Sequence, residues 1–299
     1  MTDLVADLGG TNLRLGLVRE SRLVDTESVR GSLDQAKLVD IIRSFAAQAG
    51  EPPQRAVLSV AGPVIGGVAH LTNRALTLSE VELSRDLGTE VRLINDLAAT
   101  GRALPALSGD GIGMIRPGRP VAPGNGQALV VNVGTGFNVC AVRQVDGRSI
   151  VLESETGYAA LPAGIATILK AELGRSADAV LVIEHLISGP GLARLIRELG
   201  SRGQDEDIAR RLAARLFGMV CADLALRHWP DRGLWLTGSA ARAMVSDRTP
   251  FLAGFDEVLG HPALPDSLRE HLGCMPVIEI VDDLAPLRGC MAMLADWPS

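Results

Sequence analysis

Two glycine-rich turns contain the residue types that bind phosphate. The first, Gly9-Gly10-Thr11-Asn12, follows the apolar run 4–8, and the second, Gly134-Thr135-Gly136, follows the apolar run 129–133. Glycines let backbone N–H groups approach an anion closely, and the carboxylate of Asp7, beside the first turn, can hold a hydrated Mg²⁺. Taken alone, the first segment is better explained as a hairpin turn in which Asp7 caps its own backbone, and the second can also be a plain turn.

A carboxylate at the end of an expected strand could act as a general base. Asn95-Asp96 follows the apolar run 91–94. An aspartate at the carboxyl end of a strand in an α/β fold points into the crevice where ligands bind, and there it can take a proton from a hydroxyl. Aspartate is equally typical of a helix N-cap, so position alone favours neither interpretation.

Three further segments could bind polar ligands. Glu155, in the run Glu153 to Tyr158, and Glu184 can accept paired hydrogen bonds from sugar hydroxyls, although local sequence favours a solvated loop and a helix-surface glutamate. Thr237-Gly238-Ser239 follows a short apolar strand and suits a nucleotide that packs against backbone, or equally a tight strand–helix contact.

Composition excludes several classes of protein. Only Lys37 and Lys170 among 29 basic residues are lysines, and neither follows a glycine, which excludes a Walker P-loop. Val139 stands where a dinucleotide-binding fingerprint needs its third glycine. The net charge of −6 argues against nucleic acid or an anionic membrane as a partner. Acidic residues near the start and four scattered cysteines favour a cytoplasmic chain with reduced thiols.

Apolar periodicity predicts alternating strands and helices over 299 residues, which fits two domains or one large α/β unit. Strands are expected at 4–8, 13–18, 56–60, 91–94, 129–133, 233–237 and 277–280, and helices at 34–48, 163–173, 179–187, 190–199, 206–228 and 285–296. The Gly- and Pro-rich run 107–126 is the expected linker.

The two glycine turns lie in equivalent places of a weak internal repeat. Asp7-Leu8-Gly9 aligns with Asn132-Val133-Gly134, and both are flanked by apolar β runs. Two equivalent domains, each opening with a hairpin, would form a cleft between them. The pair of turns is therefore a stronger phosphate-binding signal than either turn alone.

In order along the chain, these segments resemble bacterial glucokinases, which are hexokinase-type sugar kinases of the actin-like ATPase superfamily. Ala61-Gly62-Pro63, Thr72-Asn73 and the run 186–192 add to the resemblance, which spans essentially the whole chain. It implies an α/β, two-domain actin-like ATPase (ribonuclease H-like) fold with an interdomain cleft. Residues 1–106 with 285–299 would form the small α/β domain, and 107–284 the large α/β domain.

The same resemblance implies an ATP-dependent transferase of carbohydrate metabolism (glycolysis) that converts a hexose, glucose first, to its 6-phosphate. Asp96 would be the catalytic base, and Mg²⁺ would lie near Asp7, held through water. Homodimers are common in such families, so a dimer is expected. The expected sugar-binding residues are Asn95, Glu155, Tyr158, Glu184 and Asn73. The expected ATP-binding residues are Asp7, Gly9, Gly10, Thr11, Asn12, Gly134, Thr135, Gly136, Gly238 and Ser239.

Four positions depart from the family pattern. Tyr158 replaces the family's histidine, Leu76 an aromatic residue, Asn138 a glycine near the second phosphate turn, and Ser239 a second glycine. These departures leave two alternatives to a glucose kinase. One is a kinase for another hexose or an amino sugar, and the other is a catalytically weak sugar-binding sensor of the same fold.

Overall fold

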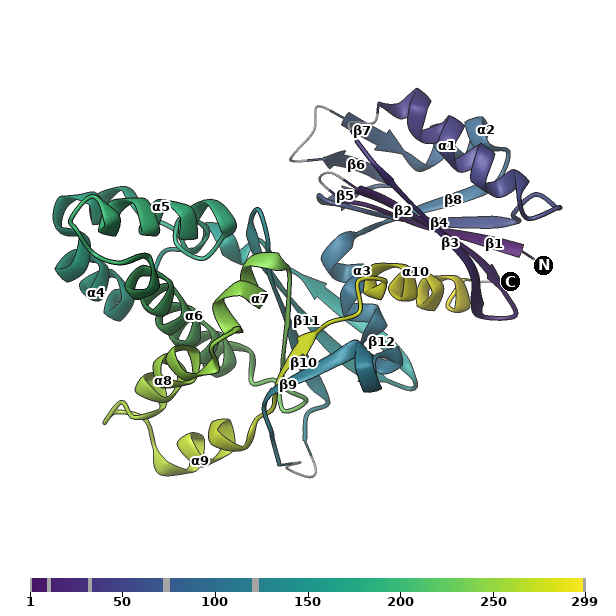
Figure 1. Ribbon diagram of the computed structural model, residues 1–299. Helices are drawn as coiled ribbons and strands as arrows, with labels where there is room; N and C mark the ends of the chain where they lie inside the picture. The colour runs from purple at the N-terminus through teal and green to yellow at the C-terminus, as the bar shows by residue number, and fades with distance from the viewer. Residues whose placement is uncertain (1, 10–11, 32–33, 72–75, 120–123, 298–299) are drawn as a thin grey trace. The chain divides into compact units, whose positions relative to one another are not determined.

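The computed structural model describes residues 2–9, 12–31, 34–71, 76–119 and 124–297. The chain divides into two compact units (Figure 1). The first unit consists of Met1–Ser108 and Asp282–Ser299, and the second consists of Gly109–Val281.

A five-stranded sheet in the order β3-β2-β1-β4-β8 forms the centre of the first unit. β1 pairs antiparallel with β2 and parallel with β4, and β4 pairs parallel with β8. Every residue of β1 is buried, as expected for a central strand covered on both faces. The strand bounds are β1 (Thr2–Leu8), β2 (Asn12–Arg19), β3 (Arg22–Arg30), β4 (Arg55–Val60) and β8 (Glu90–Asn95). A small sheet adds β5 (Val64–Ile65), β6 (Val68–Leu71) and β7 (Leu76–Ser79).

Helices cover both faces of this sheet (Figure 1). α1 (Gln35–Ala47) and α2 (Glu80–Leu87) pack on one face, where Leu38, Ile42 and Phe45 are buried against the strands. On the other face lie α3 (Asp96–Ala103), which continues into a 3₁₀ turn at Leu104–Ala106, and α10 (Ala285–Ala295).

α3 and α10 touch backbone to backbone. A Cβ atom added to Gly289 of α10 would lie 1.7 Å from the carbonyl oxygen of Ala99 in α3, so this contact requires glycine. After α10, Trp297 is almost fully buried beneath Arg55 and Arg92, whose guanidinium carbons lie 5.8 and 4.1 Å from the ring centroid. The last helix is therefore an integral part of the first unit.

The second unit has a six-stranded sheet in the order β12-β11-β10-β13-β14-β9. The expectation that 107–126 is a linker was wrong for 112–116, because these residues form β9, an edge strand paired antiparallel with β14. Ile115 is buried there, and a partner more than 150 residues away supplies the pairing, which local Gly and Pro content does not reveal. The bounds are β9 (Ile112–Arg116), β10 (Gln127–Val133), β11 (Phe137–Val145), β12 (Arg148–Glu153), β13 (Leu234–Thr237) and β14 (Val277–Ile280), with a 3₁₀ turn at Gly109–Gly111.

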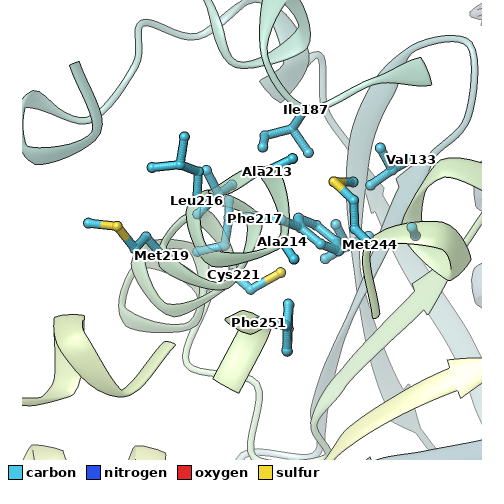
Figure 2. Close-up of a cluster of buried hydrophobic side chains, with 14 of the residues drawn as sticks. Val133, Ile187, Ala213, Ala214, Leu216, Phe217, Met219, Cys221, Met244 and Phe251 are labelled. Carbon is cyan, nitrogen blue, oxygen red and sulfur yellow. The ribbon is translucent and has the colours of Figure 1, made fainter. Parts of the chain in front are cut away.

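Three helices of the second unit, α5, α7 and α8, contact α6, which is buried along most of its length. Figure 2 shows buried side chains of this region, among them Phe217 and Phe251. Phe217 of α6 contacts Phe251 of α8 with ring centroids 5.4 Å apart. The helix expected at 179–187 was wrong, because 3₁₀ turns at Gly174–Ala179 and Ile183–His185 flank a β-bridge between Ala160 and Val182. The helix bounds are α4 (Ala163–Leu173), α5 (Gly189–Gly200), α6 (Glu206–His228), α7 (Ser239–Val245), α8 (Arg248–Leu259) and α9 (Asp266–Cys274).

Strand register confirms the internal repeat. In the first unit Asp7 pairs with Arg14 across the hairpin and with Ser59 on the parallel neighbour β4. In the second unit Asn132 pairs with Asn138 across the hairpin and with Thr237 on the parallel neighbour β13. Each unit therefore opens with a hairpin whose first strand also pairs with a parallel strand.

Candidate active site

The carboxyl ends of three parallel strands bring the candidate residues of the first unit to one sheet edge. Leu8, Val60 and Asn95 are in register at the ends of β1, β4 and β8. The residues that follow them are Gly9, Ala61 and Asp96, so the glycine turn and the candidate base lie at the same edge.

Asp7 is a buried carboxylate with both oxygens engaged. Its Oδ2 lies 3.0 Å from Nη1 of Arg14, and its Oδ1 accepts a hydrogen bond of 2.7 Å from the hydroxyl of Ser59. Burial raises the pKa of Asp7, and the contacts with Ser59 and Arg14 oppose that rise. Arg14 and Ser59 were not predicted, although a tight hairpin places residue 14 opposite residue 7.

The first glycine turn closes through its backbone. The N–H of Gly9 donates to the carbonyl of Asn12 over 2.9 Å. A Cβ atom on Gly9 would meet that carbonyl oxygen at 3.6 Å, an ordinary contact, so the turn itself leaves room for a side chain. Three predicted residues, Gly10, Thr11 and Asn73, lie outside the described residues.

Asn95, and not Asp96, caps α3 from the preceding position. The side-chain oxygen of Asn95 accepts from the N–H groups of Leu97 and Ala98, and its amide donates to the carbonyl of Gly62 over 3.1 Å. Asp96 is the first helical residue, is half-buried, and accepts from the N–H of Leu97 at 2.8 Å. The N-cap of α3 is therefore Asn95, not Asp96. The Asp96 carboxylate lies in the first turn, where the helix dipole is positive.

The second glycine turn rests on Glu184. The N–H of Gly134 donates to the carbonyl of Gly136 over 2.9 Å, and the Gly134 carbonyl accepts from Gly189 at 2.8 Å. Glu184 Oε2 accepts from the N–H of Phe137 at 2.9 Å. A Cβ atom on Gly136 would lie 2.7 Å from that same oxygen, so glycine keeps room for the carboxylate.

Asn138 holds the loop that carries Glu155. Its amide donates to the carbonyl of Ser154 over 2.5 Å, and its oxygen accepts from the N–H of Thr156 at 3.1 Å. This departure from the family pattern therefore has a visible partner in the protein, and its side chain is committed to the loop.

Three carboxylates near the second glycine turn are coupled through their pKa values. Partial burial, followed by the charge of Glu184, raises the pKa of Glu155. Partial burial, followed by the charge of Glu155, raises the pKa of Glu153. Glu155 and Glu184 therefore lie within electrostatic reach of each other.

Tyr158 presents its ring to solvent. It ends a 3₁₀ turn (Thr156–Tyr158), the residue is 66% exposed, and its N–H donates to the carbonyl of Glu155 at 3.2 Å. Gly157 before it is buried, and a Cβ atom there would lie 2.2 Å from the carbonyl oxygen of Phe137. The close approach fixes the loop and leaves Tyr158 at its tip.

Gly238, which follows β13, packs closely against the backbone just before the second glycine turn. Its φ is +98°, and a Cβ atom would lie 2.3 Å from the carbonyl oxygen of Val133, the last residue of β10. Ser239 is exposed at the start of α7. Leu76 lies elsewhere, in β7, where it packs against the core of the first unit.

The donor chemistry at Asp7 is compatible with indirect contact to Mg²⁺. A carboxylate has about four lone-pair sites, so an oxygen that accepts one protein hydrogen bond can accept a second from a metal-bound water. Within the described part of the chain, no three His, Cys, Asp or Glu residues cluster as a metal site. In the same residues, no helix combines the length and apolar character needed to cross a membrane.

Comparison with known proteins identifies the family. The family model described as Glucokinase matches residues 4–214. A glucokinase of Xanthomonas oryzae pv. oryzae is 31% identical, and the match covers 98% of this chain and 95% of that protein. The structure of a glucokinase from an Antarctic psychrotroph superimposes with a TM-score of 0.80 at 26% identity, covering 99% of both chains.

A second solved structure carries ligands. A ROK family glucokinase from Streptomyces griseus, in complex with glucose and AMPPNP, has the same fold with a TM-score of 0.60 at 18% identity, covering 98% of this chain and 99% of that one. The expected α/β fold of the actin-like type and the expected enzyme class are confirmed. The chain belongs to the glucokinase family of ATP-dependent, hexokinase-type phosphotransferases.

Proposed function

We propose that this protein transfers the terminal phosphoryl group of ATP to the primary hydroxyl of glucose, forming glucose 6-phosphate, with Asp96 as general base. The observation that carries this proposal is the shared sheet edge, where Asp96 follows β8 and the Asp7–Asn12 turn follows β1. A carboxylate and a phosphate-binding turn at one edge are what a hydroxyl-to-phosphate transfer needs. The similar proteins are named glucokinases.

The proposed nucleotide contacts come from backbone groups. Gly9, Gly134 and Gly136 present turns that can approach phosphate oxygens, and Gly238 gives the nucleoside a close approach to backbone. Mg²⁺, when bound with ATP, neutralises charge on the phosphates. Asp7, kept in place by Arg14 and Ser59, is the proposed acceptor for the water shell of that ion.

The proposed sugar contacts are Glu155 and Glu184, with Tyr158, Asn95 and Asn73. Glu184 is the better fixed carboxylate, because one oxygen already accepts a backbone hydrogen bond. Tyr158 is exposed at the tip of the same loop as Glu155 and carries a hydroxyl that can donate to a sugar. If Tyr158 binds the sugar, Tyr158→Phe raises KM for the best sugar and leaves kcat nearly unchanged. Unchanged kinetics would remove Tyr158 from the proposed sugar contacts.

The decisive experiment is a coupled ADP-release assay over a panel of hexoses and amino sugars. We expect glucose to stimulate ATP turnover most, and Asp96→Asn to lower kcat roughly 10²–10⁴-fold, as loss of a general base does. Asp110→Asn is the matched control, since Asp110 is exposed in the second unit. No sugar-stimulated turnover, or Asp96→Asn activity near wild type, would refute the assignment.

The second candidate is a weakly catalytic sugar sensor, and it is favoured by Tyr158 in place of the family's histidine. Sugar-dependent thermal stabilisation without ADP release would support the sensor over the kinase. A homodimer and a cytoplasmic location are also proposed, from the family resemblance, and sedimentation analysis tests the dimer.

A further inference from the structure

The first unit contains a cavity at the sheet edge opposite Asp7 and Asp96. Its volume is about 310 Å³, and it lies at the amino ends of β1 and β4 against α1. Leu4, Ile42 and Ala56 line it, and each is at most 2% exposed in the folded chain. Pockets of this size commonly hold small molecules.

Small side chains of α1 leave the space open. Ala46 and Ala47 line the cavity from the helix, Gly50 follows the helix, and Pro52 with Pro53 closes the wall before β4. Because the lining is mainly apolar, water gains few hydrogen bonds inside, and an apolar group is the better occupant.

Arg43 places a positive charge at the rim of this cavity. It lines the cavity from α1, and its guanidinium donates to the carbonyl of Asp86. Among the described residues, no carboxylate forms an ion pair with Arg43, so its charge is balanced only by a carbonyl and solvent. A carboxylate is the group that fits its fork of donors best.

Glu51 makes the two ends of the cavity differ in charge. It also lines the cavity, and its Oε1 accepts from the hydroxyl of Thr2 at 2.8 Å, which itself accepts from Arg19. Its negative charge is thereby held toward the start of β1. An anionic ligand is repelled from that end and attracted to the Arg43 end.

We propose that this cavity binds a small monocarboxylate with an apolar body. The carboxylate accepts from Arg43, and the hydrocarbon part packs against Ala46, Ala47 and Leu87, the lining residues that keep accessible apolar surface. Fatty acids and aromatic acids share this chemistry, and the site is independent of the proposed sugar and ATP contacts.

Titration calorimetry of the full-length protein with octanoate and with 1-octanol tests the proposal, without sugar or nucleotide. We expect one octanoate per chain, bound more tightly than octanol. Arg43→Gln should weaken octanoate about tenfold, as expected for a lost charged hydrogen bond, and leave octanol unchanged. Glu51→Gln should strengthen octanoate. Lys37→Gln, an exposed basic position on the same helix, is the matched control and should change neither.

A cavity-filling variant separates the cavity from surface binding. Ala46→Leu should weaken both probes, and its thermal unfolding checks that it is folded. The proposal is overturned if octanoate does not bind at one site, or if it binds Arg43→Gln as tightly as the wild type. An aromatic acid such as phenylpropionate, compared with octanoate, then distinguishes the two ligand sources.

Discussion

The two hairpins that open the two units share a backbone arrangement and differ in charge. Across β1 and β2, the buried Asp7 carboxylate faces Arg14, with Ser59 on the neighbouring strand. At the equivalent places of the second unit stand Asn132, Asn138 and Thr237, all neutral. The two units therefore share the backbone pairing around the turn, but only the first unit has charged side chains at these positions.

The difference concerns where each unit carries charge. In the first unit a buried carboxylate, paired with the half-buried Arg14, lies directly before the glycine turn that we propose as a phosphate site. In the second unit Asn138 is used to hold the loop of Ser154 and Thr156, and the negative charge comes from Glu155 and Glu184 outside the hairpin. An equivalent backbone position is thus no guide to an equivalent role.

The largest predicted effect is the loss of the cation in the first hairpin. Arg14→Met leaves the Asp7 carboxylate buried without its partner and should lower the unfolding free energy by about 3 kcal/mol at pH 7. Burial raises the pKa of Asp7, and Arg14 opposes that rise by favouring the charged carboxylate. The stabilisation that Arg14 supplies is therefore present where Asp7 is charged and is lost as pH falls and Asp7 is protonated.

Urea unfolding from pH 7 to pH 4 measures this difference, with Asn138→Leu as the comparison in the second hairpin. We expect Asn138→Leu to be destabilising by about 1–3 kcal/mol with little dependence on pH, because neutral hydrogen bonds are lost. Equal pH profiles for the two variants would contradict the division of charge between the hairpins.

The next effect concerns glycine packing in the two units. Gly157→Ala should destabilise the protein by about 1–3 kcal/mol, because the new methyl group would lie 2.2 Å from the Phe137 carbonyl oxygen. Gly9→Ala should change the unfolding free energy far less, since its methyl group meets only an ordinary contact at 3.6 Å. Chemical unfolding of both variants checks the order, and a reversed order would show that the turns pack otherwise.

The smallest effect concerns the carboxylates of the second unit. The pKa of Glu155 is raised in the folded chain, so its charged form costs stability as pH rises above the ordinary range of a glutamate. Because Glu155 is exposed, solvent screens most of this cost. Glu155→Gln should therefore raise the unfolding free energy at pH 7 by no more than about 0.5 kcal/mol, and by less at pH 4. Glu172→Gln, an exposed glutamate of the same unit, is the control. A loss of stability at pH 7 would contradict the mutual repulsion.

Local sequence patterns predicted the elements that do not depend on a partner far along the chain. The long helix over 206–228 and the two hairpins follow directly from periodicity and turn residues. The 179–187 segment has apolar residues at helical spacing, but Val182 pairs with Ala160 and interrupts it. β9 was assigned to a linker for the same reason, since its partner β14 lies far along the chain.

Sequence motifs indicated the candidate residues, but they did not indicate the residues that hold those candidates in place. Asp96 and Glu184 stand at positions that the order of motifs indicated, and their roles stay predictions. Ser59, which fixes Asp7, is brought to it by strand pairing across 52 positions, and no local pattern marks it. The contacts that orient a site are long-range in sequence, so motifs locate the site before they describe it.

The discontinuous first unit has a consequence for synthesis on the ribosome. Its sheet loses one covering helix until α10, which lies within the final stretch Asp282–Ser299, has been translated. Residues 109–281 are complete before that stretch emerges. The second unit can therefore be completed before the first, and a stop codon shortly before Ala285 would leave the amino-terminal sheet with an uncovered apolar face that chaperones and proteases recognise.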